Sequence, residues 1–166
     1  MDSRLQRFKD AQSQRGSGFE SALAEIQGGR KRGHWIWYVF PQLAGLGQSA
    51  MSQRYGIDGI AEAEAYLRDP VLRGRLLTIA LAVAEQLRRG VSIESLMNSS
   101  IDATKLVSSM TLFGHVAKRL QRTEGIDGYA SLAQIADDVL AAAEAEGLLP
   151  CEFTLDRLGA LPPGHD

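Results

Sequence analysis

The sequence predicts an all-α fold, a compact multihelical single domain of about 6–8 helices with one long central helix. Three observations support this prediction. Apolar residues recur three and four positions apart along most of the chain, which is the spacing of one helix face. Residue pairs that begin or end helices, such as Asp69-Pro70 and Gly28-Gly29, separate these stretches. Strand signals are scarce and are confined to residues 31–42.

Caps and spacing place the elements of the first half. We expect a short helix over residues 5–12, then a loop, and a helix over residues 19–26. Asp58 is expected to cap a helix that runs to about residue 68. Asp69 as a cap and Pro70 at the first helical position begin a helix that runs to Arg89. The apolar face of this helix is broad, so we expect it to be the long central helix.

The second half is expected to be helical as well. Ser92 can cap a short helix, and Asp102 can cap a longer helix from Ala103 to about Leu120. An alanine-rich amphipathic helix is expected over residues 129–146, and a short helical segment over residues 152–158. These elements complete the all-α prediction without a second domain.

Bulk properties limit the class of protein. The chain has 166 residues, 45 % of them hydrophobic, which is enough for one buried core and excludes disorder for most of its length. We expect one helical domain over residues 1–160 and a flexible tail over residues 161–166, which holds Pro162-Pro163-Gly164. The single cysteine, Cys151, excludes an internal disulfide and a cysteine metal cluster. No metal site and no cofactor are expected.

Charge and hydropathy limit the partners and the location. The formal net charge of -2 gives no general attraction to nucleic acid or to an anionic membrane, so nucleic acid is not an expected partner. Residues 1–14 are polar and lack the apolar core of a signal peptide. The longest apolar run, residues 76–84, is far shorter than the roughly 20 residues that cross a bilayer. A cytoplasmic protein without a membrane-bound part is therefore expected.

Residues 31–42 concentrate the unusual side chains, including both tryptophans. Their aromatic and β-branched residues allow a strand, but an isolated strand has no partner, so we favour two turns of helix ended by Pro41. On a helix, Trp35 and Trp37 are about 200° apart, whereas Trp37 and Phe40 share a face. One tryptophan is therefore expected in the core and the other beside a cleft or a partner surface. Two core tryptophans are the alternative.

Several stretches, taken in order, carry a family resemblance. They include His34-Trp35-Ile36-Trp37-Tyr38-Val39-Phe40-Pro41-Gln42, Tyr55-Gly56-Ile57, Pro70-Val71-Leu72 and Ser108-Ser109-Met110-Thr111-Leu112-Phe113. Over roughly residues 5 to 120, the chain resembles the bacterial domain-of-unknown-function family numbered 1810. Some members of that family carry the label calpastatin, which nothing in this chain supports. The resemblance implies an all-α fold of one domain, and it implies no function.

The segment that carries the resemblance also holds the first candidate site residues. His34 is the best candidate for a catalytic acid or base, and the alternative is a hydrogen bond at a helix end. Arg30, Lys31 and Arg32 precede the expected helix start, where cations and backbone N–H groups suit a phosphate or a carboxylate. The alternative is a solvated basic turn. Gln42 can read a ligand amide or tie down the following glycine-rich loop.

A second polar cluster comes from the helix expected over residues 103–120. It consists of Lys105, Ser108, Ser109 and Thr111. Lys105 and Ser109 are four positions apart and share a helix face at the border of the apolar stripe. A serine–lysine pair can be a nucleophile with its base, but no oxyanion hole or third group is identifiable. We therefore favour a role in orienting a ligand or in structural hydrogen bonds.

Two main functional hypotheses follow, and a third, nucleic-acid binding, has the basic cluster and the aromatic residues in its favour but the near-neutral charge against it. In the first, an aromatic and basic cleft binds a small anionic or nucleotide-like molecule related to ADP-ribose or NAD, and any reaction is hydrolysis of an N-glycosidic bond. Its expected lining is Arg30, Lys31, Arg32, His34, Trp35, Trp37, Tyr38, Gln42, Lys105, Ser108, Ser109 and Thr111. This hypothesis requires residues 30–42 and 105–111 to meet. In the second, the aromatic segment is an interface for another protein or for a homodimer.

Overall fold

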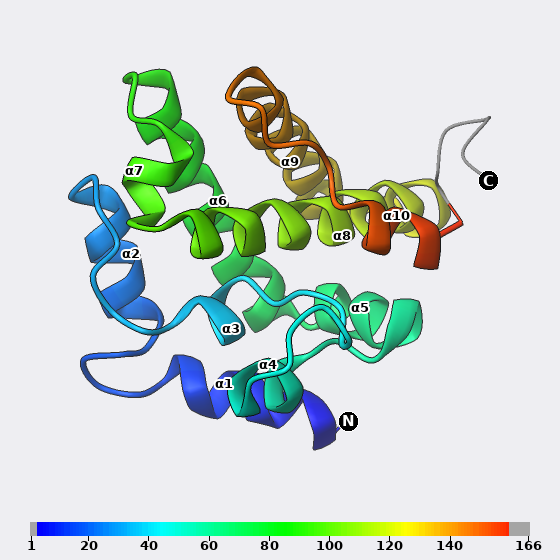
Figure 1. Cartoon of the computed structure of the whole chain (residues 1–166). Helices are drawn as coiled ribbons and strands as arrows, with labels where there is room; N and C mark the ends of the chain where they lie inside the picture. Colours follow the sequence, from blue (N-terminus) through cyan, green and yellow to red (C-terminus); the bar gives the residue numbers. More distant parts are fainter. Residues whose placement is uncertain (1–2, 160–166) are drawn as a thin grey trace.

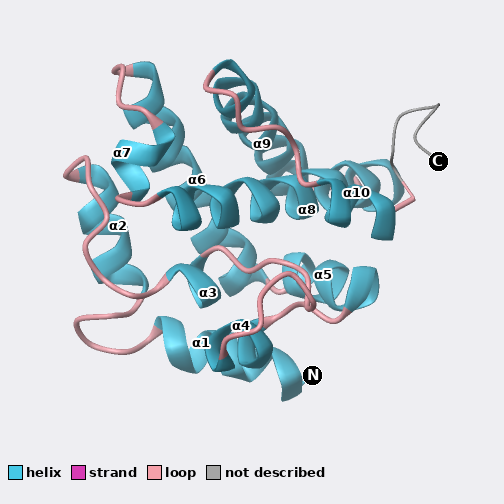
Figure 2. Ribbon diagram, in the orientation of Figure 1, coloured by secondary structure: helices cyan, strands magenta, loops and turns pink. Residues whose placement is uncertain are grey.

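Ten α-helices and one short 3₁₀ helix form the part of the chain that the computed structural model describes, residues 3–159 (Figure 1). The helices are η1 (Ser3–Leu5), α1 (Gln6–Gln12), α2 (Phe19–Gln27), α3 (Ile36–Val39), α4 (Ala50–Tyr55), α5 (Gly59–Arg68), α6 (Pro70–Arg88), α7 (Ile93–Met97), α8 (Ser100–Glu124), α9 (Asp127–Ala145) and α10 (Glu152–Arg157). Within these residues there is no strand, which confirms the all-α prediction (Figure 2). The count exceeds the expected number of about 6–8, and α4 is a helix that sequence reasoning did not predict.

The central helix is α8, and not the helix that begins at Pro70. With 25 residues, α8 is the longest helix of residues 3–159, and it crosses the middle of the fold (Figure 1). It begins before the expected start because Ser99, and not Asp102, is its cap: Ser99 Oγ accepts the Asp102 N–H at 3.0 Å. It ends at Glu124 and is followed by the C-cap Gly125, whose φ of 69° suits a glycine.

Local signals placed α6 correctly. The Asp69 carboxylate accepts the N–H groups of Val71 and Leu72 at 3.0 and 3.1 Å, and Pro70 occupies the first turn. The pKa of Asp69 is lowered: burial raises it, but the Lys9 ammonium and these N–H groups outweigh burial. Asp58, in contrast, does not cap α5; its own N–H donates to the buried Glu62 carboxylate at 3.1 Å.

The helices pack in pairs around α6 and α8. α9 lies along both of them, α2 lies against α6, and α5 contacts α6 and α8. Gly114 of α8 allows the close approach of α9, because a Cβ atom at Gly114 would lie 2.9 Å from Ala136 Cβ. α10 packs on α8, where the Cys151 N–H donates to Thr111 Oγ1 at 3.2 Å.

Residues 31–42 do not form the expected two-turn helix. Only Ile36–Val39 is helical, and Pro41 follows this single turn. After it, the backbone pairs with the stretch before α5: Ala44 N–H donates to the Ile57 carbonyl, and Ile57 N–H donates to the Gln42 carbonyl, each at 2.9 Å. This isolated parallel bridge between Leu43 and Ile57 supplies the partner that sequence reasoning did not find. The expected tail, residues 161–166, lies outside the described residues.

Candidate functional site

The two tryptophans divide between the core and its edge, which is one of the two alternatives that the sequence leaves open. Trp35 is fully buried, and its ring lies 6.3 Å from the ring of Phe40, so Phe40 packs on Trp35. This replaces the expected Trp37–Phe40 face, because the segment makes only one helical turn. Trp37 is half-buried, with the Lys105 ammonium 5.2 Å from its ring centroid. Trp37 is therefore the tryptophan beside the second polar cluster.

The turn before α3 holds a carboxylate of the protein itself. Glu25 Oε1, from α2, accepts the N–H groups of Arg32 at 2.6 Å and Gly33 at 2.7 Å. It also accepts the Trp35 indole N–H at 3.0 Å. Burial raises the pKa of Glu25, but these three donors and the Lys31 charge outweigh it and the net pKa is lowered. The anion position that the sequence predicts here is thus occupied by Glu25.

The basic triplet separates into one buried and two exposed residues. Lys31 is 5 % exposed; its ammonium lies 2.8 Å from the Asp102 carboxylate and 4.9 Å from the Trp35 ring centroid, and donates to the Gly33 carbonyl. Arg30 is exposed and donates to Asn98 Oδ1 at 2.7 and 3.1 Å. Arg32 is exposed as well. Lys31 and Trp35 therefore serve the interior, and their predicted ligand contacts stay a prediction.

His34 and Tyr38 lie apart from any catalytic arrangement among residues 3–159. The His34 side chain is exposed, and no hydrogen bond or ion pair of those residues involves its imidazole. Tyr38 is buried, and its hydroxyl donates to the Ser17 carbonyl at 2.6 Å. Burial, which outweighs this hydrogen bond, raises the pKa of Tyr38. His34 thus lacks the orienting partner that a general base in a catalytic triad uses.

The second polar cluster belongs to α8, and most of its side chains are buried in the protein. Ser108, Ser109 and Thr111 are each less than 4 % exposed. Thr111 Oγ1 donates to the Val107 carbonyl at 2.7 Å, whereas Ser109 Oγ has no partner among the described residues. Lys105 and Ser109 are therefore not joined by a hydrogen bond, as a nucleophile and its base would be.

The two predicted segments do meet, at Trp37 and Lys105. A hollow beside this contact is lined by Trp37, Gln42, Ser52, Tyr55 and Gly56, and its volume is about 10 Å³. That volume is close to the minimum for one water molecule, and the buried Trp37 indole N–H has no partner among the described residues. The contact therefore brings the two segments together, as the first hypothesis requires, but the hollow is too small for a nucleotide.

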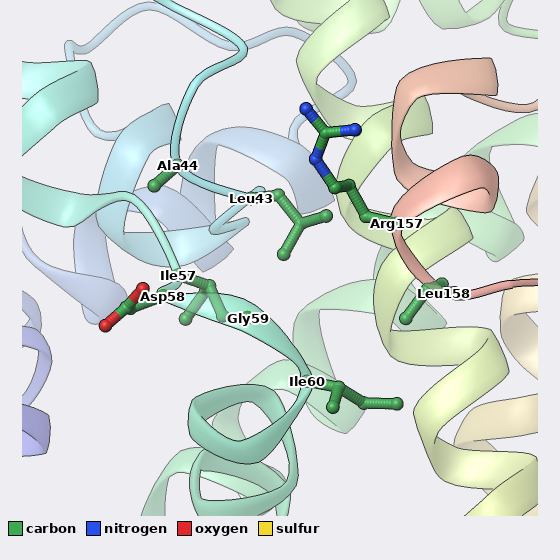
Figure 3. Close-up of a pocket in the computed structure, with 8 residues that line it drawn as sticks. All are labelled: Leu43, Ala44, Ile57, Asp58, Gly59, Ile60, Arg157 and Leu158. Carbon is green, nitrogen blue, oxygen red and sulfur yellow. The ribbon is translucent and has the colours of Figure 1, made fainter.

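A larger pocket lies beside the Leu43–Ile57 bridge, and both of these residues line it (Figure 3). Its volume is about 280 Å³, and three separate stretches line it: Leu43 and Ala44, Ile57 to Ile60, and Arg157 with Leu158. Figure 3 shows the side chains of Leu43, Ile60 and Leu158 around the open space. Sequence reasoning missed this pocket, because these side chains carry no motif and meet only through the bridge and the packing of α10.

Two charged residues stand at the rim of this pocket. Asp58 points away from Leu158 in Figure 3, and its carboxylate is paired with Arg4 Nη1 at 3.0 Å. Arg157 is exposed; its guanidinium carbon lies 4.4 Å from the centroid of the Phe153 ring, and Nη1 lies 3.1 Å from the neighbouring Asp156 carboxylate. Such exposed neighbouring pairs are weak, so Arg157 can turn to an added anion at little cost.

The sequence profile of the family described as "Protein of unknown function (DUF1810)" matches residues 2–134. The chain belongs to this family. A conserved hypothetical protein from Mycobacterium tuberculosis, known from a crystal structure, shares 35 % sequence identity with this DUF1810 protein. The two structures match with a TM-score of 0.68, over 92 % of this chain and 94 % of the other. No curated protein matches the sequence.

Family membership covers the two predicted segments but not the whole pocket. Residues 30–42 and 105–111 lie inside the matched part of this DUF1810 protein, whereas Arg157 and Leu158 follow it. Residues 3–159 hold no group of three or more histidine, cysteine, aspartate or glutamate side chains that could bind a metal ion. None of their helices is long and apolar enough to cross a membrane.

Proposed function

We propose that this DUF1810 protein binds a small anionic molecule with an apolar body in the pocket between Leu43, Ile60 and Leu158. The observation that carries the proposal is the combination of an apolar lining with a cation at the rim, in a pocket of about 280 Å³. Pockets of this type, mostly apolar with a few orienting polar groups, are the usual form of small-molecule sites.

The volume supports a ligand smaller than a dinucleotide. Drug-sized ligands occupy pockets of about 300–1,000 Å³, so about 280 Å³ suits one ring or a short branched chain. ADP-ribose or NAD could place only one part of the molecule there. We therefore propose a small carboxylate as the preferred class, and a nucleotide as the variant that the experiment must test.

The charges at the rim support an anion. Arg157 can turn toward the pocket at little cost, because it contacts an exposed carboxylate and an aromatic ring. Gly59 and Ile60 begin α5, whose dipole favours negative charge at this end. The opposing carboxylate of Asp58 is already paired with Arg4.

We propose binding without catalysis. Hydrolysis of an N-glycosidic bond would use an acid or base within reach of the ligand. Asp58 is the acidic residue of the pocket lining, and its carboxylate points away from Leu158 (Figure 3). His34 does not line this pocket. We also propose a cytoplasmic location, which the single cysteine favours and cell fractionation would test.

A thermal-shift screen tests the proposal. The panel contains small carboxylates such as benzoate and isovalerate, together with ADP-ribose and NAD. A ligand at about 100 times its Kd should stabilise the protein by roughly 2.7 kcal/mol.

Ala44→Phe fills the pocket from its exposed rim, and Arg157→Ala removes the cation; both should abolish the shift. Arg15→Ala, an exposed arginine in the loop before α2, is the matched control and should keep it. A shift that survives Ala44→Phe, or no shift with any compound, would refute the proposal.

The interface hypothesis has less support, because the aromatic segment is mostly interior. Trp35, Tyr38 and Phe40 are each at most 3 % exposed, and Trp37 is half-buried. A homodimer through this segment would first have to expose these rings. Sedimentation equilibrium tests it: a mass that rises from that of one chain, 18.0 kDa, to twice that value with concentration would favour a homodimer.

A further inference from the structure

We propose that the turn over residues 31–35 is a preformed carboxylate-binding site, and that Glu25 is its built-in occupant. Three N–H donors converge on a single oxygen, Glu25 Oε1: those of Arg32, Gly33 and the Trp35 indole, at 2.6, 2.7 and 3.0 Å. Hydrogen bonds to a charged acceptor are about twice as strong as those between neutral groups. The turn is thus built around an anion and not around a solvated basic cluster.

The shape of the turn keeps room for the carboxylate. A Cβ atom at Gly33 would lie 3.3 Å from the other carboxylate oxygen, Glu25 Oε2, and 3.0 Å from Trp35 Cδ1. Trp35 is fully buried, so its indole N–H is fixed in direction. Gly33 therefore holds open the space that the carboxylate fills.

A buried cation completes the site. Lys31 is 5 % exposed, and it donates to the Gly33 carbonyl, which orients the peptide that follows the donor N–H. Its ammonium also pairs with Asp102 of α8 at 2.8 Å, so the lysine cannot swing out to solvent without breaking that ion pair. The donors are therefore held by α8 and by the core, independently of the Glu25 side chain.

An outside anion cannot compete while Glu25 is tethered beside the turn, because the tether gives its carboxylate a high effective concentration. Removing the carboxylate changes this. Glu25→Ala deletes a CH₂ group and the carboxylate, which are the atoms that acetate supplies. The donors, the glycine cradle and Lys31 remain, so acetate should enter the vacated site and restore the lost hydrogen bonds.

The test is chemical rescue of Glu25→Ala. The Tm of the variant is measured at increasing concentrations of sodium acetate, and sodium chloride keeps the ionic strength constant. We expect the variant to lose about 5 °C or more in Tm, because three donors lose a charged acceptor. Acetate should restore Tm saturably, and chloride should not. Glu20→Ala, on the same helix but exposed, is the matched control and should show neither effect. Acetate bound near Arg157 would stabilise both variants alike.

Two outcomes would overturn the proposal: a Glu25→Ala protein as stable as the wild type, or a response to acetate that equals the response to chloride. If Glu25→Ala does not fold, it must refold from urea in acetate and not in chloride, and failure to do so also overturns the proposal. Glu25→Gln provides a second measurement. Its amide oxygen still fills the site, so this variant should fold and should not respond to acetate.

Discussion

Neighbouring residues in this chain have different roles because their partners lie far away in the sequence. Lys31 is buried against Asp102, whereas Arg30 and Arg32 on either side of it are exposed. The sequence predicts a basic cluster at this point, and the cluster is present. The sequence cannot show which of the three cations is buried, because that depends on where α8 places Asp102. A carboxylate does lie beside the triplet, but it is that of Glu25 of the chain itself, and a bound anionic ligand there stays a prediction.

His115 gives a pH prediction at the scale of one residue. This half-buried side chain of α8 has a lowered pKa, because burial first, and then the charges of Arg119, Arg122 and Lys118, disfavour its protonation. The unfolded chain therefore binds a proton more readily than the folded protein does. The resulting stability is fully present above the ordinary pKa of 6.5, and it is lost as the pH falls through the lower folded value.

The prediction concerns the difference in free energy of unfolding between the wild type and His115→Gln. We expect this difference to shift against the wild type as the pH falls. Relative to His115→Gln, which does not titrate, the wild type should lose free energy of unfolding between about pH 7.5 and about pH 5.5. Urea unfolding of both proteins at each pH measures the difference. A difference that stays constant, or that grows as the pH falls, would contradict the lowered pKa.

At the scale of elements, helix ends were predictable where the signal is local. Asp69-Pro70 placed the start of α6, and Ser92 placed α7 by accepting the Ser95 N–H at 3.1 Å. One error is local, since Ser99 and not Asp102 caps α8. The larger errors come from tertiary contacts. α8 became the central helix because α5, α7, α9 and α10 all pack on it, which no local pattern records. Residues 31–42 form a single turn, because Glu25 holds the stretch before it and the Ile57 backbone pairs with the stretch after it.

The contact between α8 and α9 gives a prediction whose sign depends on packing. Replacing a helical glycine by alanine ordinarily stabilises by about 1 kcal/mol. At Gly114 the new Cβ would lie 2.9 Å from Ala136 Cβ, so the two helices must separate. We expect Gly114→Ala to lower the free energy of unfolding by about 1–2 kcal/mol despite its better helix propensity.

A compensating substitution separates the clash from any other effect. Ala136→Gly alone should cost about 1 kcal/mol through helix propensity. The double variant Gly114→Ala with Ala136→Gly moves the methyl group to the other helix and removes the close approach. It should be more stable than Gly114→Ala alone, as measured by a double-mutant cycle in urea. Additive losses in the cycle would show that the close approach does not decide the effect.

At the scale of the whole molecule, the sequence predicted the fold class but not the pocket. Helical periodicity and caps act within a few residues, so they predict helices. The pocket needs Leu43, Ile57 and Leu158 to meet, and these side chains look like ordinary core residues in the sequence. The meeting of Trp37 with Lys105 was predictable only as a requirement of one hypothesis, and the structure provides it without a cleft of nucleotide size.

The Lys31–Asp102 ion pair connects the turn after α2 to the central helix, and it gives the last prediction. Their side chains are 6 % and 19 % exposed, so neither charge is well solvated. Asp102→Ala would leave a buried ammonium without its carboxylate, and we expect a loss of about 3 kcal/mol in the free energy of unfolding. Replacing both charges by apolar residues, as in Lys31→Met with Asp102→Leu, should cost less than Asp102→Ala, because it removes the desolvation penalty, although it also removes the Lys31 hydrogen bond to the Gly33 carbonyl. Urea unfolding of the single and double variants tests this difference. If Asp102→Ala costs no more than the double variant, the ion pair does not fix the turn to α8, and other contacts, such as the Lys31 N–H bond to the Leu96 carbonyl at 2.7 Å, hold the turn instead.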